Sequence, residues 1–224
     1  MTNPHKPTQN MYGDTLYKQT PTPNETPAFV REKLVEFESA LDEVAVGEKR
    51  GYLMAKEKCP SECDKLVFLR CEVFNVDQAV CRFVKYWNAR IQVFGEEKAF
   101  LPMTIDGAMK DDAECIQLGY LQVASQVDPD GRAIGLFDFN KQTGEVSSES
   151  LLRVVWYQVH VALARESCQK RGFVAYVKCL DRMADFRPSL SKKIAQAVRG
   201  ILPFRFAGVH FMNRASIKFR QQCH

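Results

Sequence analysis

The chain has 224 residues, 46% of them hydrophobic and 26% charged, with a formal net charge of +4. This composition is typical of a globular protein with one sizeable core or a small lobe beside a larger one, and it excludes disorder throughout. No window approaches the roughly 18 uninterrupted apolar residues of a membrane-spanning helix. The eight cysteines are too sparse for a disulfide scaffold, so we expect a reducing, cytoplasmic location.

Charge is distributed unevenly along the chain. Residues 165–224 carry 13 Lys and Arg against three acids, a net charge of +10, whereas residues 1–164 carry 18 bases against 24 acids, a net charge of −6. A basic segment suits an anionic membrane surface or a phosphate-bearing ligand, and it is equally typical of a solvated surface. Nucleic acid is not an expected partner, because the aromatic residues among these bases lie mostly in segments that resemble buried strands. The bases expected to contact an anionic membrane are Lys192, Lys193, Arg199, Arg214, Lys218 and Arg220.

The N-terminal part predicts a leader followed by helices. Residues 1–26 are rich in Pro, Thr, Asn and Gln without an apolar period, which predicts a flexible leader and no secretory signal. Thr26 followed by Pro27 is typical of a helix start, and this helix should run to Val44, with Gly47 after it. A second helical stretch is predicted over residues 48–58.

The segment 66–87 predicts a helical hairpin. Asn75 is suited to cap the second helix, and Gln78 completes an N-x-x-Q variant of the capping box. We expect Phe68 and Leu69, in the short helix before this joint, to pack against the second helix. That helix carries an apolar stripe at steps of three or four residues, formed by Val76, Val80, Phe83, Val84, Trp87, Ile91 and Phe94. Residues 27–97 are therefore predicted to form an all-helical lobe of four short helices.

Residues 98–224 predict an α/β domain. Short apolar runs at 115–123 and 132–139 are expected to be strands joined by a turn at 128–131. A helix capped by Ser148 or Ser150 should follow, then a strand at 173–180, a helix opened by Pro188 and a strand at 206–212. This alternation is typical of a mostly parallel β-sheet covered by helices.

Three motifs, in order along the chain, resemble one known family. Phe68, Leu69 and Arg70 with residues 74–79 resemble the family's FLRARxFDVxxA segment, and Gly131 with Arg132 resembles its D-x-x-GRP turn. The third motif is the strand that carries Pro203, His210 and Asn213. Together they make residues 62–214 similar to the CRAL-TRIO lipid-binding domains of the phosphatidylinositol and α-tocopherol transfer proteins.

The resemblance implies an α/β domain over residues 98–224 that binds a phospholipid or another hydrophobic ligand without catalysis or a cofactor. It also implies intermembrane transfer of that ligand through transient association with a membrane surface. The family continues past the position of Asn213 into a gate helix, so the domain is expected to be incomplete at its C-terminus. The residues expected to line the pocket, from one alternating face of neighbouring strands, are Phe137, Phe139, Tyr176, His210 and Met212.

Two other classes of function are alternatives to lipid binding. The first is a degenerate family member that loads no lipid and recruits a protein partner or an anionic membrane. The second is an enzyme, which is not expected because the chain lacks the G-x-S-x-G, G-x-G-x-x-G, Walker and H-E-x-x-H motifs. No metal site is expected either, since Cys59 and Cys63 lack a second ligand pair. Asp111 and Asp112 are expected to lie in a solvated hydrophilic loop.

Overall fold

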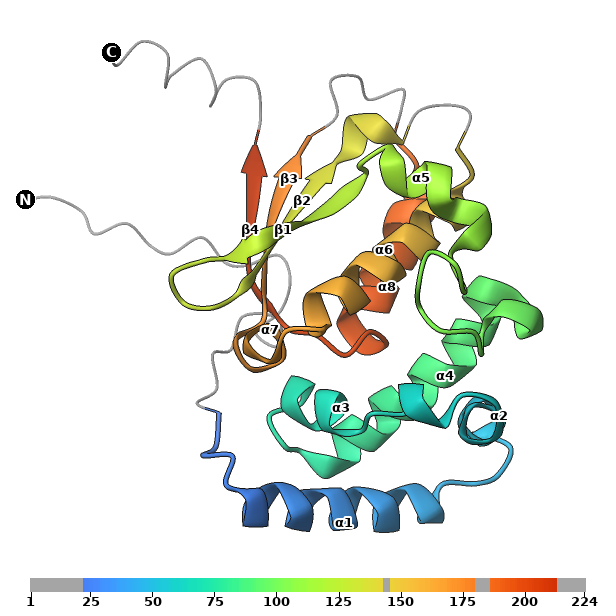
Figure 1. Cartoon of the computed structure of the whole chain (residues 1–224), viewed down its shortest axis with the longest axis vertical. Helices are drawn as coiled ribbons and strands as arrows, with labels where there is room; N and C mark the ends of the chain where they lie inside the picture. The colour runs from blue at the N-terminus through green and yellow to red at the C-terminus, as the bar shows by residue number, and fades with distance from the viewer. Residues whose placement is uncertain (1–21, 143–145, 180–185, 213–224) are drawn as a thin grey trace, which may run out of the picture.

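The computed structural model describes residues 22–142, 146–179 and 186–212. Figure 1 shows a helical region at one end of the molecule and a four-stranded sheet with its helices at the other. The helical region lies where the sequence predicts four helices, although the last of them is long, at 23 residues. Its helices are α1 (Pro27–Glu43), α2 (Arg50–Lys58), α3 (Leu66–Cys71) and α4 (Val76–Lys98), with a 3-10 turn at Pro60–Glu62.

Local capping sets the starts of the two longest helices of this region. The Oγ1 atom of Thr26 accepts the backbone N–H of Phe29 at 3.2 Å, at the start of α1. Asn75 Oδ1 accepts the N–H of Gln78 at 3.1 Å, at the start of α4. Each cap satisfies an N–H that the first helical turn leaves without a partner, which confirms both predicted helix starts.

The chain bends sharply between α3 and α4, where two consecutive residues adopt left-handed backbone conformations. Val73 and Phe74 both have left-handed φ angles, of 53° and 61°. The bend lets Phe74 pack on Phe29 of α1 with ring centroids 5.0 Å apart. Phe68 of α3 meets Phe83 of α4 edge to face at 5.0 Å, so the predicted packing of this hairpin is confirmed.

The sheet contains β1 (Leu121–Val127), β2 (Ala133–Asp138), β3 (Phe173–Lys178) and β4 (Phe206–Met212), in the order β1-β2-β3-β4. β2, β3 and β4 are parallel, as predicted, and β1 is antiparallel to β2, so the sheet is mixed. The predicted strand at 115–123 is wrong over its first half, where α5 (Ala113–Gln117) forms instead. A short apolar run does not distinguish a buried helical turn from a strand, and Gly119, with a φ of 73°, turns the chain between the two.

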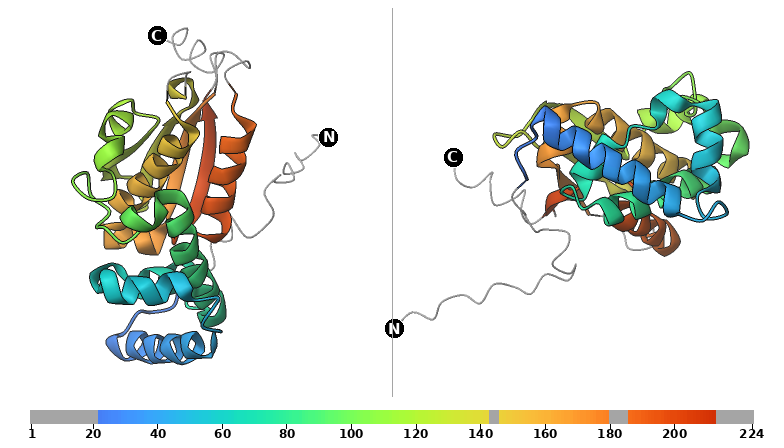
Figure 2. Two further views of the ribbon diagram at one scale, coloured as in Figure 1. Left: turned by 90° about the vertical axis from the view of Figure 1, so that its right-hand side faces the viewer. Right: turned by 90° about the horizontal axis from the view of Figure 1, so that it is seen from below.

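Two long helices cover one face of this sheet. α6 (Ser148–Leu163) and α8 (Pro188–Gly200) both lie to the right of the strands in Figure 1, and the left view of Figure 2 looks from that side between the two helices onto the sheet. α7 (Glu166–Arg171) lies between α6 and β3 in the chain. The short α7 was not predicted. The cap of α6 is Ser147, whose Oγ accepts the N–H of Ser150 at 2.9 Å, so the assignment of Ser148 or Ser150 as the cap is wrong by at least one residue.

The helical region and the sheet share one continuous apolar core, which extends from Phe37 of α1 to Phe204 before β4.

Asp112, in the 3-10 turn Lys110–Asp112, does not lie in a solvated loop as expected. Its carboxylate is buried and accepts two hydrogen bonds from Arg153 of α6, at 2.6 and 2.8 Å. None of the described helices combines the length and apolar character needed to cross a lipid bilayer.

Candidate ligand-binding cavity

A cavity of about 310 Å³ lies between α8 and the sheet. This volume is at the lower end of the range, roughly 300–1,000 Å³, that small-molecule pockets occupy. The strands contribute Phe137, Ala175, Val177, Phe206, Val209 and Phe211, and the 3-10 turn Phe139–Lys141 contributes Phe139. Phe186 comes from just before α8, and the helix itself contributes Ser191, Ile194, Ala195, Val198 and Arg199.

Small side chains keep the space between helix and sheet open. Ala175 of β3 and Ala195 of α8 both line the cavity. A side chain of one carbon at each position leaves unfilled the space that a leucine or isoleucine would occupy in a close-packed interface. Val177 and Ile194 complete apolar walls, so the cavity favours an aliphatic or aromatic ligand.

α8 is fixed at both ends, which holds the cavity wall in place. Near its start, Arg187 donates to the carbonyl oxygen of Val146 at 2.6 Å. At its end, Arg82 of α4 donates to the carbonyl oxygens of Arg199 and Leu202 at 3.1 and 2.9 Å. A cation bonded to the last carbonyls stabilises a helix C-terminus, so the helical region contributes directly to the position of this wall.

The polar groups of the lining are few. The side chains of Ser191 and Arg199 are the polar ones among the described lining residues, and none of those residues is Asp, Glu, His, Cys or Lys. The lining therefore offers a hydroxyl and a guanidinium that suit the polar end of a ligand.

The five residues predicted to bind ligand do not share one face. Phe137 pairs with Val177 of β3, and Val177 pairs with Phe211 of β4, so all three point toward α8. Tyr176 and His210 also pair with each other, but their positions alternate with these and lie on the opposite face.

Phe137 and Phe139 line the cavity as predicted, whereas Tyr176, His210 and Met212 do not. The rings of Tyr176 and His210 stack instead on the far face of the sheet, with centroids 4.9 Å apart. The prediction mixed two faces because side chains alternate along a strand, and an error of one residue in phase moves a whole set to the other side.

Sequence reasoning missed the alternate residues of β3 and β4 that do line the cavity, Ala175, Val177, Val209 and Phe211. The register of each strand relative to β2 would have identified them, but register is set by pairing between strands. The spacing of the apolar residues predicts one apolar face of α8, but it does not indicate that this face lines a cavity.

The predicted membrane-binding bases fall into two groups. Lys192, Lys193 and Arg199 lie exposed on α8, and Arg199 also lines the cavity. Lys193 Nζ lies 3.2 Å from Glu149 Oε1 of α6. Arg214, Lys218 and Arg220 lie outside the described residues.

Of the cysteines considered as metal ligands, Cys59 is buried and Cys63 partly buried. Burial raises the pKa of the Cys63 thiol to about 11, which disfavours the thiolate that a metal would bind. Among the described residues, no group of three or more His, Cys, Asp or Glu side chains is placed to hold a metal ion.

The candidate site is thus an apolar cavity bounded on one side by α8, with one serine and one arginine among its described lining residues. No protein-family model matches this chain.

Proposed function

We propose that this protein binds a hydrophobic ligand in the cavity between α8 and the sheet, without catalysis, in the manner of the CRAL-TRIO proteins that its sequence resembles. The observation that carries the proposal is the cavity itself, about 310 Å³ in volume and lined almost throughout by apolar side chains. Burying apolar ligand surface there contributes about 0.8 kcal/mol for each methylene group removed from water.

The volume of the cavity bears on which class of hydrophobic ligand we propose. At about 310 Å³ the cavity is at the lower end of the roughly 300–1,000 Å³ that small-molecule pockets occupy. This favours a compact hydrophobe or a single acyl chain over both chains of a diacyl phospholipid. A carboxylate or phosphate at the polar end of such a ligand would suit Arg199, because the donor fork of a guanidinium can bind two oxygens of either group.

The first experiment is native mass spectrometry with lipid extraction on the full chain, followed by titration with a fluorescent long-chain fatty acid. Ala195→Trp fills the cavity from the helix side, and Gln196→Trp is its matched control, because Gln196 is exposed, adjacent and not among the lining residues. We expect wild type and Gln196→Trp to bind the probe and Ala195→Trp to bind it at least tenfold more weakly, a loss of about 1.4 kcal/mol.

Two outcomes would contradict the proposal. One is a wild-type protein that carries no lipid and takes up no probe, which would leave the recruitment of a partner as the better account. The other is equal binding by Ala195→Trp and wild type, which would place any bound ligand elsewhere.

A further inference from the structure

A groove of about 480 Å³, the α1–α4 groove, lies between α1 and α4 in the helical region. Its floor consists of short apolar side chains that are buried or half-buried, Ala40 and Val44 on the α1 side and Val80 and Val84 on α4. On each side the two residues are four positions apart, close to one helical turn, so they lie along the same side of the helix. The groove shares no described lining residue with the cavity beside α8 and is therefore a separate site.

Two side chains hold the walls of the α1–α4 groove in place. The buried Lys49 donates from Nζ to the carbonyl oxygens of Leu41 and Asp42, at 2.7 and 3.1 Å, and so fixes the C-terminal end of α1. Asn88 of α4 donates to the carbonyl oxygen of Glu48 at 2.6 Å and fixes the loop that follows α1. Contacts within the chain thus position both walls, which lowers the entropic cost of binding a partner there.

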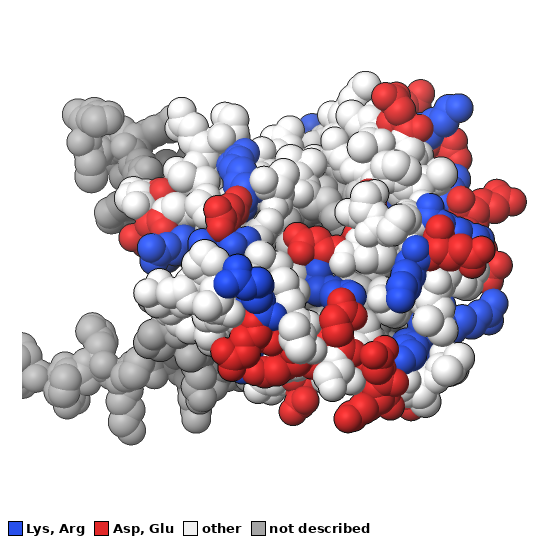
Figure 3. All heavy atoms as spheres, turned by 60° about the horizontal axis from the view of Figure 1, so that its bottom comes forward, with Lys and Arg blue, Asp and Glu red and all other residues white. Residues whose placement is uncertain are grey.

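The rim of the α1–α4 groove is acidic. Glu43 and Glu48 on the α1 side and Asp77 on α4 are exposed, and none of the three forms an ion pair with another described residue. Lys85 is the one base among the described lining residues, so the lining has a net charge of −2. Figure 3 shows acidic side chains gathered along the lower edge of the end of the molecule that α1 forms. An acidic rim around an apolar floor complements an apolar surface that is bordered by basic side chains.

The dimensions of the groove match a short helix. On α4 the lining runs from Asp77 to Asn88, which is about 16 Å at a rise of 1.5 Å per residue. A helix of about 11 residues has this length, and its apolar side chains recur every three or four residues. That spacing is the same as the spacing of the floor positions, so the side chains of such a helix can pack between them.

We propose that the α1–α4 groove binds a helical segment of a partner protein, apolar on the side that meets the floor and rich in Lys or Arg beside it. Amphipathic helices bind in apolar grooves through anchors at these spacings. The larger apolar side chains of the partner fill the space above Ala40 and Val80, and its bases lie opposite Glu43, Glu48 and Asp77. This interaction goes beyond ligand binding beside α8 and does not depend on it.

The test uses the full chain and a fluorescein-labelled peptide of about 11 residues, with leucines three and four residues apart and lysines at the other positions. A matched peptide carries glutamate in place of every lysine. By fluorescence anisotropy we expect the lysine peptide to bind at least about tenfold more tightly than the glutamate peptide. Raising the salt to about 1 M should weaken this binding, since it shortens the screening length to about 3 Å.

The acidic rim is tested with the double variant Glu43→Gln, Glu48→Gln. Its control is Glu32→Gln, Glu57→Gln, which removes the same charge from two exposed positions that do not line the groove. An exposed ion pair contributes up to about fivefold to binding, so we expect the rim variant to bind the lysine peptide about fivefold more weakly and the control to bind it like wild type.

The apolar floor is tested with Ala40→Trp, whose indole ring would occupy the groove. Ser39→Trp is its control, because Ser39 is adjacent, exposed and not among the lining residues. We expect Ala40→Trp to bind the lysine peptide at least about tenfold more weakly and Ser39→Trp to bind it like wild type. Should Ala40→Trp fail to fold, the two glutamine variants decide the question alone.

Peptide binding and ligand binding fail separately. A wild-type protein that binds neither peptide, or both equally, would overturn the proposed groove site, as would rim and floor variants that bind the lysine peptide like wild type. Binding of the lysine peptide that is weakened in the rim variant, in a protein that takes up no fatty acid, would support the groove site and contradict the proposed function.

Discussion

His160 of α6 is held neutral between two helices. Its Nδ1 lies 2.7 Å from the carbonyl oxygen of Trp156, which only accepts, so Nδ1 carries the proton and Nε2 accepts from the Tyr86 hydroxyl at 2.7 Å. Arg90, fully buried, donates to the same hydroxyl at 3.1 Å and to Glu62 at 2.6 Å. Burial, with the positive charge of Arg90, lowers the pKa of His160 from 6.5 to about 4.

This histidine predicts an acid sensitivity. A pKa lowered in the folded state means that the unfolded chain binds the proton more tightly. The contribution of His160 to stability is therefore complete above about pH 6.5 and is lost as the pH falls to about 4, on the order of 3 kcal/mol in total. Urea unfolding across this range should show a smaller acid-induced loss for His160→Gln than for wild type. Equal losses in both proteins would show that other groups cause the acid sensitivity.

At the scale of elements, the pairing of β2 with β3 depends on a glycine. A Cβ atom placed on Gly135 would lie 2.0 Å from Cζ of Phe173, whose buried ring also meets Phe204 and Phe206. The aromatic ring of β3 therefore lies over the backbone of β2, and the strand at this point has room for a hydrogen only. The sequence predicts a strand here without indicating why a glycine stands in it.

We expect Gly135→Ala to destabilise the protein by about 1–3 kcal/mol, because the added methyl group would displace a ring that is packed on several sides. Gly47→Ala is the matched control, since a Cβ there meets nothing within 4 Å. The midpoints of urea unfolding compare the two variants. A Gly135→Ala protein as stable as wild type would mean that the Phe173 ring moves without cost.

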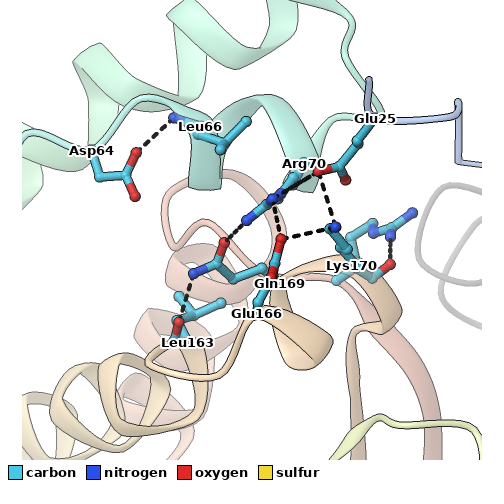
Figure 4. Close-up of polar contacts among 9 residues, drawn as sticks. Glu25, Asp64, Leu66, Arg70, Leu163, Glu166, Gln169 and Lys170 are labelled. Atoms are coloured by element: carbon cyan, nitrogen blue, oxygen red, sulfur yellow. Dashed lines mark hydrogen bonds and ion pairs between the residues drawn. The ribbon is translucent and has the colours of Figure 1, made fainter. Parts of the chain in front are cut away.

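At the scale of the whole molecule, Arg70 joins the helical region to the sheet region (Figure 4). Its guanidinium donates to Glu25 at 2.7 and 2.9 Å, to Gln169 of α7 at 2.5 Å and to Glu166 of α7 at 2.7 Å. Lys170 lies 3.3 Å from the same Glu25 carboxylate. Glu25 belongs to the segment predicted as a flexible leader, yet its side chain is only 9% exposed, so this end of the segment is held by the contact.

We expect Arg70→Leu to cost about 3 kcal/mol or more, because it leaves the largely buried carboxylate of Glu25 without its main partner. Hydrogen exchange should accelerate in α3 and α7 together. Lys33→Leu removes a pair with Glu36 within α1, at the helix surface, and should cost less than about 1 kcal/mol. Unchanged stability and exchange in Arg70→Leu would show that the shared apolar core alone holds the two regions together.

Much of the fold was predictable because its signals are local. The caps at Thr26 and Asn75 act on an N–H three residues away, so the sequence alone contains both partners. The parallel strands β2, β3 and β4 follow similarly from short apolar runs separated by helices. Where the apolar run was short and lay beside a glycine, as at 115–119, the same signals did not distinguish helix from strand.

The sequence by itself determined most of the helices and strands and their order, because hydrogen bonds and periodicity within each segment decide this. It did not predict α7, and it favoured a strand at 115–117, where α5 forms. Only the tertiary structure decided which face of the sheet meets α8. Because side chains alternate along a strand, each strand has two sets of side chains, one on each face of the sheet. Packing between segments far apart in the chain decides which of these two sets faces α8. The cavity depends on the same long-range choice, since it exists where Ala175 and Ala195, twenty positions apart in the chain, line the same space with side chains too small to fill it.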